Sequence, residues 1–154
     1  MEKQYQYKHI QVAVDGSKEA DMAFHKAISV AKHMHATLEI LHVIDTRSFQ
    51  NVSSFDSAMV EQVSNDAKIK MEKYYQEAVD AGVAEVHYSI EFGSPKTIIG
   101  RDFPKQHDID LIVVGATGLN AVERLLIGSV TEYVTRTANC DILVVRQVAK
   151  SDKN

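Results

Sequence analysis

The sequence predicts an α/β domain: an open, doubly wound sheet of five parallel strands with helices on both faces. Segments typical of strands and helices alternate from one end of the chain to the other. Several of the strands are almost continuous apolar runs, as expected for parallel strands that are covered on both sides. A chain of 154 residues, 45% hydrophobic and 25% charged, suits one domain over 1–154. We expect an ordered core over about 8–146, with polar tails at both ends.

In the first half of the chain, the apolar pattern indicates two strands and two helices. A strand over 10–14 precedes a helix over 20–34, whose apolar side chains recur at helical spacing. A second strand over 38–44 precedes a longer helix over 59–78, and we expect that helix to stop near Gly82.

In the second half, the segment 86–92 alternates apolar and polar residues and is predicted to be the third strand. Ser94 is a suitable N-cap, and Pro95 a suitable first residue, for a short helix. The remaining elements are a strand, a helix and a last strand: 111–114, 129–138 and 142–145.

The strand patterns favour the spatial order 3-2-1-4-5. The alternating third strand suits an outer position with one wetter face, whereas the continuous apolar strands suit cover on both faces. This order places the switch point between the first and fourth strands, where ligands bind at the carboxyl ends. The segment 15–17 and Gly115 would then meet at the mouth of one crevice.

The last strand presents an unprotected edge in this order. The segment 142–145 reads Ile-Leu-Val-Val, with no lysine or proline to discourage pairing with another chain. We expect a two-fold homodimer through this edge. The alternative is an edge that the chain's own tail covers.

Composition argues against several classes of protein. The formal net charge of −4 argues against non-specific nucleic-acid binding. No apolar run approaches the roughly 18 residues of a membrane span, and residues 1–8 lack the apolar core of a signal peptide. The single cysteine, Cys140, cannot form an internal disulfide. We expect a cytoplasmic protein without membrane or nucleic-acid partners.

Two glycine segments carry the functional prediction. Gly115-Ala116-Thr117-Gly118 ends an apolar strand, and Gly128-Ser129 opens a helix. Glycine allows close approach to an anion, and the N–H groups of a first helical turn bind phosphate. No lysine follows the last glycine, so the pattern is not a Walker loop. The alternative is that these glycines serve only as turns.

The chain resembles the universal stress protein family, in the branch that binds ATP. The family's signature Gly-x2-Gly-x9-Gly-Ser/Thr is matched in full by Gly115, Gly118, Gly128 and Ser129. Further similar segments extend the resemblance over nearly the whole chain: 12–17, 41–44, 93–95 and 142–146.

The resemblance implies a set of residues around ATP, with AMP or ADP as possible ligands. The ribose and phosphates would be surrounded by Gly115, Gly118, Gly128, Ser129 and Val130. The adenine side and crevice floor would be lined by Ala13, Asp15 and Val43. Val114 and the backbone of Ala116 and Thr117 would lie beside the ribose.

Asp15 has two interpretations that the sequence leaves open. In the functional interpretation, Asp15 either acts through a divalent ion or forms a hydrogen bond to the adenosine. A carboxylate beside phosphates needs a divalent ion between them, so Mg²⁺ or Mn²⁺ would arrive with the nucleotide and not in a protein cage. Alternatively, Asp15 forms a local turn before a helix whose N-cap is Ser17. The histidines and Cys140 show no spacing typical of zinc ligands, and we predict no protein-held metal site.

We therefore expect an ATP-binding, homodimeric stress-response protein in which the nucleotide is a signal or a stabilising ligand. One alternative is a slow Mg-dependent ATP hydrolase, although the chain has no P-loop lysine and we predict no catalytic residue. Another is a nucleotide-free dimeric interaction module. The polar segment 45–57 is either a lid or disordered, and the segment 119–127 would wrap the phosphates.

Overall fold

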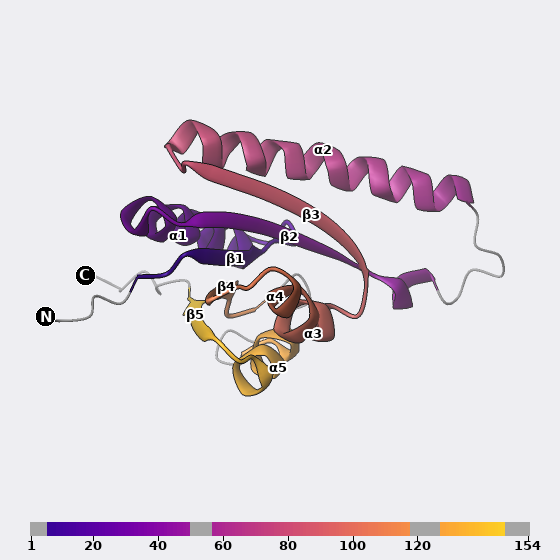
Figure 1. The fold of residues 1–154 in the computed structure, drawn as a ribbon. Helices are drawn as coiled ribbons and strands as arrows, with labels where there is room; N and C mark the ends of the chain where they lie inside the picture. Colours follow the sequence, from indigo (N-terminus) through magenta and orange to yellow (C-terminus); the bar gives the residue numbers. More distant parts are fainter. Residues whose placement is uncertain (1–5, 50–56, 118–126, 147–154) are drawn as a thin grey trace, which may run out of the picture.

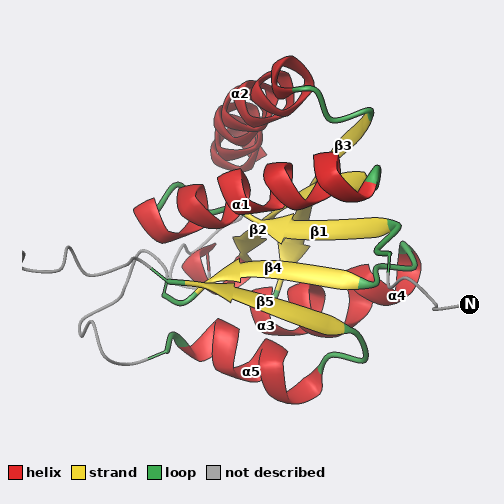
Figure 2. Cartoon of the chain, turned by 90° about the vertical axis from the view of Figure 1, so that its left-hand side faces the viewer, coloured by secondary structure: helices red, strands yellow, loops and turns green. Residues whose placement is uncertain are grey.

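A computed structural model describes residues 6–49, 57–117 and 127–146, and the structural statements that follow concern these ranges. All pairings between neighbouring strands are parallel, and the strand order is β3-β2-β1-β4-β5, which confirms the predicted topology (Figure 2). The strands are β1 His9–Ala13, β2 Thr37–Asp45, β3 Glu85–Gly93, β4 Leu111–Gly115 and β5 Asp141–Val145.

Helices cover both faces of the sheet, as predicted (Figure 1). The longer helices, α1 (Lys18–Met34) and α2 (Ser57–Ala81), lie on one face. The other face carries α5 (Ser129–Thr137) and a helical segment that begins at Pro95. None of the described helices combines the length and the apolar character that a membrane span requires.

The apolar core divides into two main layers, one on each side of the sheet. Ile10 and Val12 of β1 pack with Phe24 of α1 in the first layer. Leu41 of β2 and Phe103 pack in the second layer. Neighbouring strand residues point to opposite faces, so each central strand contributes to both layers.

The segment predicted as a short third helix is longer than expected. It runs without interruption through α3 (Pro95–Thr97), a π-helical turn η2 (Ile98–Asp102) and α4 (Phe103–Gln106). Gly100 and Pro104 obscure this helix in the sequence, because both residues disfavour helix interiors. Burial of Ile99 and Phe103 against the sheet stabilises it nonetheless.

Two further predictions concern the start of α3 and the segment 45–57. Ser94 occupies the N-cap position of α3, but its side chain makes no capping hydrogen bond. In the segment 45–57, residues Thr46–Phe49 form a 3₁₀ helix, η1, and residues 50–56 lie outside the described ranges.

Candidate functional site

A cavity of about 340 Å³ opens at the carboxyl ends of β1 and β4, where the strand order reverses. This is the place where open parallel sheets bind ligands, and the volume lies in the range of small-molecule sites. Its lining residues come from all parts of the chain: Ala13, Val14, Asp15, Ala20, Leu41, Val43, Asp45, Arg47, Pro95, Ile99, Val114, Gly115, Thr117, Gly128, Ser129, Val130 and Thr131.

The first wall is the turn between β1 and α1. The Oδ1 atom of Asp15 accepts a hydrogen bond from the Ser17 backbone N–H at 2.9 Å. Gly16 has φ +84°, a conformation that side chains disfavour, and so permits this tight turn. Ser17 then caps α1, because its Oγ accepts a hydrogen bond from the Ala20 N–H at 3.1 Å. The structure thus contains the local turn and the predicted Ser17 cap, while Asp15 also lines the cavity.

The second wall joins the two glycine segments. The Gly128 N–H donates a hydrogen bond to the Ala116 carbonyl at 2.7 Å. The Thr131 hydroxyl donates to the Gly115 carbonyl at 2.7 Å, and Thr131 is buried. These two bonds hold the start of α5 against the end of β4.

The first turn of α5 faces the cavity. Gly128 is its N-cap, and Ser129, Val130 and Thr131 all line the cavity. The N–H groups of a first helical turn have no acceptor within the helix, and they carry the positive end of the helix dipole. This wall therefore suits a negatively charged group of a ligand.

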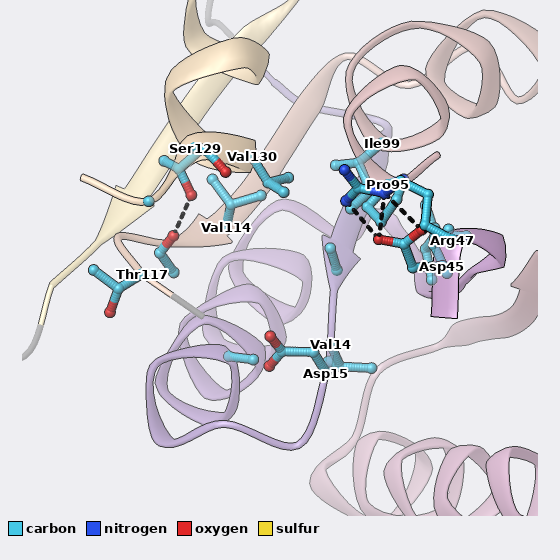
Figure 3. Close-up of a pocket in the computed structure, with 17 residues that line it drawn as sticks. Val14, Asp15, Asp45, Arg47, Pro95, Ile99, Val114, Thr117, Ser129 and Val130 are labelled. Atoms are coloured by element: carbon cyan, nitrogen blue, oxygen red, sulfur yellow. Dashed lines mark hydrogen bonds and ion pairs between the residues drawn. The ribbon is translucent and has the colours of Figure 1, made fainter. Parts of the chain in front are cut away.

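The third wall combines apolar and charged side chains. Figure 3 shows Asp45 and Arg47 near Pro95 and Ile99, away from Ser129. Arg47 donates from Nε to Asp45 Oδ1 at 3.0 Å and from Nη2 to Asp45 Oδ2 at 2.6 Å. These bonds hold the pKa of the Asp45 carboxyl below its usual value.

The charges of this cavity are unevenly balanced. The described lining residues include two carboxylates, Asp15 and Asp45, and a single cationic side chain, Arg47. A polyphosphate would therefore depend on the N–H groups of α5 and on a divalent ion to offset repulsion. No group of three or more potential metal ligands occurs in the described part of the chain.

The structure brings most of the predicted site residues together. Nine of them line the cavity: Ala13, Asp15, Val43, Val114, Gly115, Thr117, Gly128, Ser129 and Val130. Ala116 is buried and contributes through its backbone, since its N–H donates to the Val145 carbonyl at 2.9 Å and its own carbonyl binds Gly128. Gly118 and residues 119–126 lie outside the described ranges.

Sequence reasoning missed the rest of the lining: Val14, Ala20, Leu41, Asp45, Arg47, Pro95, Ile99 and Thr131. Asp45 could have been found, because it is a polar residue directly after an apolar strand and belongs to the same sheet edge as Asp15. Ile99 carries no such signal, since it belongs to an apolar helix face whose position depends on tertiary packing.

Comparison with known proteins gives a consistent result. Residues 6–146 match the model of the universal stress protein family. A protein of Staphylococcus aureus (strain USA300) that carries a universal stress protein name is 45% identical over 140 residues, which cover 91% of this chain and 84% of that protein. The solved structure of universal stress protein UspA from Lactobacillus plantarum has a TM-score of 0.83 and 35% identity, and the match covers 93% of this chain and 100% of that one.

Two more distant structures have the same fold and hold nucleotides. A universal stress protein in complex with cAMP has a TM-score of 0.62 and 24% identity, covering 92% of this chain and 98% of that one. One from Archaeoglobus fulgidus in complex with dAMP has a TM-score of 0.63 and 23% identity, covering 92% of this chain and 100% of that one.

Proposed function

Because this chain belongs to the universal stress protein family, we propose that it is a cytoplasmic stress-response protein whose cavity binds an adenine nucleotide, ATP in particular. The nucleotide acts as a signal or a stabilising ligand. The observation that carries the proposal is the wall in which Gly128 binds Ala116 and the first turn of α5 faces the cavity. The cAMP and dAMP complexes of distant relatives support the choice of adenine nucleotides.

The ligand's phosphates lie at the first turn of α5 in this proposal. Ser129, Val130 and Thr131 supply N–H donors and the dipole supplies partial positive charge. The base lies toward the apolar side chains of Val43 and Ile99. Asp15, whose Oδ1 is held by Ser17, has its second oxygen outside that turn and lies next to the Mg²⁺ or Mn²⁺ that accompanies the nucleotide.

Ser129 offers a test that separates binding from folding. We expect Ser129→Asp to reduce ATP affinity at least tenfold, because a carboxylate at the first turn repels phosphate. The same carboxylate interacts favourably with the helix dipole, so α5 keeps its stability. Ser129→Asn is the matched uncharged control. Calorimetric titration with ATP, AMP and cAMP measures the affinities, and equal ATP affinity in the Asp and Asn variants contradicts the proposed phosphate position.

We propose binding, and not turnover, as the main role. The described lining contains no lysine, and one oxygen of Asp15 is already engaged in a turn. Slow Mg-dependent hydrolysis would appear as phosphate release that Ser129→Asp abolishes. Release that persists in this variant would come from a contaminating enzyme.

We also propose that two chains pair along β5. This strand is an edge of the sheet, and its Ile142, Leu143 and Val144 are only partly buried. The chain's own tail, 147–154, lies outside the described residues. Sedimentation equilibrium should give twice the monomer mass of 17.2 kDa. Ile142→Lys, a charge of the kind that protects natural edge strands, should shift the equilibrium to monomer. A wild-type protein that stays monomeric at all concentrations contradicts this pairing.

A further inference from the structure

Gln11 is a fully buried polar side chain in the central strand β1. Burying an amide is costly unless both its ends form hydrogen bonds. Its Nε2 donates to the Ile99 carbonyl at 3.0 Å. Because a carbonyl can only accept, the nitrogen end must point to Ile99, and this settles the orientation of the amide. Its Oε1 is buried and has no hydrogen-bond partner.

Gln11 replaces a donor that the π-helical turn has removed. In a regular α-helix, the Phe103 N–H would bond to the Ile99 carbonyl. In η2, the Phe103 N–H instead donates to the Ile98 carbonyl. Pro104, the next residue, has no N–H to offer. The Gln11 amide therefore supplies the hydrogen bond that the Ile99 carbonyl has lost to helix geometry.

This bond connects the centre of the sheet with the cavity. Ile99 lines the cavity on the side of Asp45 and Arg47 (Figure 3). Without the Gln11 donor, the Ile99 carbonyl would be a buried acceptor with no partner. The segment η2 would then lower its free energy by shifting to a position where this carbonyl finds a donor. The position of this apolar wall thus depends on the side chain of Gln11.

The strand register places a polar residue beside Gln11, and its side chain is a candidate partner for the Oε1 atom. Gln11 pairs with Ile112 on β4 and with Glu39 on β2. Paired residues on neighbouring parallel strands point to the same face, and the strands lie about 4.8 Å apart. Ile112 is apolar and fully buried, so Glu39 is the polar cross-strand neighbour. A protonated carboxyl can donate to Oε1, whereas a carboxylate only accepts.

Glu39 lies in an environment that favours its proton. Burial raises the pKa of the Glu39 carboxyl, and the nearby Glu85 on β3 raises it further. The histidines that face it lower the pKa of Glu39: His87 on β3, His107 after α4 and His9 on β1.

We propose that Gln11 is a positioning residue for the nucleotide cavity and that the protonated carboxyl of Glu39 donates to its Oε1, so that one proton controls the Ile99 wall. The part of this proposal that concerns affinity rests on the proposed nucleotide function. When Glu39 loses its proton, its carboxylate competes for the Gln11 Nε2 donor. Ile99 then loses its hydrogen bond, and the cavity binds nucleotide more weakly.

The first test is the pH dependence of ATP affinity, measured by calorimetry from about pH 4, below the ordinary pKa of a glutamate, to about pH 9. We expect the wild-type affinity to fall about fivefold as Glu39 ionises, the equivalent of one ordinary hydrogen bond. Glu39→Gln keeps a permanent N–H donor, so it should bind ATP tightly without this fall. Gln11→Met should bind about fivefold more weakly throughout. Glu85→Gln is the matched control, which changes a charge near Glu39 but keeps both partners of the proposed hydrogen bond, and it should keep the size of the fall.

The second test does not depend on any ligand. The side-chain NH₂ signals of Gln11 in NMR spectra should shift with pH in the wild type and stay constant in Glu39→Gln. Identical behaviour of the two proteins, in the Gln11 signals and in the pH profile of ATP affinity, overturns the proposal. If wild-type protein binds no ATP at any pH, the proposed function fails, and the Gln11 signals alone then decide whether Glu39 controls this amide.

Discussion

Gly115 lies so close to α1 that a Cβ atom added to it would be 2.8 Å from the backbone oxygen of Glu19. The neighbour is a helix backbone, which cannot move aside as a flexible side chain could. Gly115 is therefore required for packing β4 against α1, whatever the cavity binds. The first glycine of the signature has a structural role in addition to the proposed role in binding.

This contact predicts a loss of stability in Gly115→Ala. Overpacking of this kind costs about 1–3 kcal/mol of unfolding free energy. Gly128→Ala is the control, because Gly128 has φ −61° and ψ 155°, which any residue adopts. Urea unfolding should give a lower midpoint for Gly115→Ala than for Gly128→Ala. Equal midpoints would show that α1 can move away from β4 at little cost.

Thr131→Val should loosen the joint between β4 and α5. Valine keeps the shape of threonine but cannot donate to the Gly115 carbonyl, which is bonded at 2.7 Å in the wild type. The expected loss is about 1–2 kcal/mol of unfolding free energy. Thr135→Val, which removes a bond within the exposed side of α5, should cost less. A larger loss in Thr135→Val would argue against the importance of the buried bond.

The pKa of Glu39 predicts how stability depends on pH. Burial raises this pKa above the unfolded value of about 4.3, so the folded chain holds the proton more tightly than the unfolded chain. The stabilising contribution of Glu39 is therefore complete below pH of about 4.3 and is lost as pH rises through the folded pKa. Glu39→Gln should remove this loss and unfold at higher denaturant concentration than wild type at pH 8. A lower midpoint for the variant at pH 8 would contradict the sign of the effect.

Cys140 should react slowly with thiol reagents. Burial raises the pKa of its thiol to about 11, so almost no reactive thiolate exists at pH 8. Labelling with a disulfide reagent should be much slower in folded protein than in urea. Equal labelling rates would show that the half-buried thiol is exposed and ionised more than its surroundings imply.

Much of the fold follows from local patterns in the sequence. The alternation in 86–92 indicated an edge strand, and the continuous apolar run over 111–114 indicated a strand with cover on both faces. Side-chain periodicity indicates which face of a helix or strand is buried, even when the element that packs against that face is unknown. The same patterns led to the order β3-β2-β1-β4-β5.

The helix from Pro95 to Gln106 shows where local reasoning stops. Its Gly100 and Pro104 are poor helix formers, and only the burial of Ile99 and Phe103 reveals why the segment is helical. The sequence likewise offers no sign that Gln11 is wholly buried, because a glutamine in a strand is ordinarily assigned to a wetter face.

The sequence by itself determined the fold class, the strand order and the two glycine segments, because periodicity, turn residues and motif spacing are local properties of the chain. Only the tertiary structure decided which residues share the cavity. Tertiary packing places Ile99 and the Asp45–Arg47 pair in the lining of the cavity that Ser129 also lines, and it packs Gly115 against the backbone of Glu19. Such contacts depend on strand register and helix packing between segments far apart in the chain, and side-chain period along one segment contains no information about them.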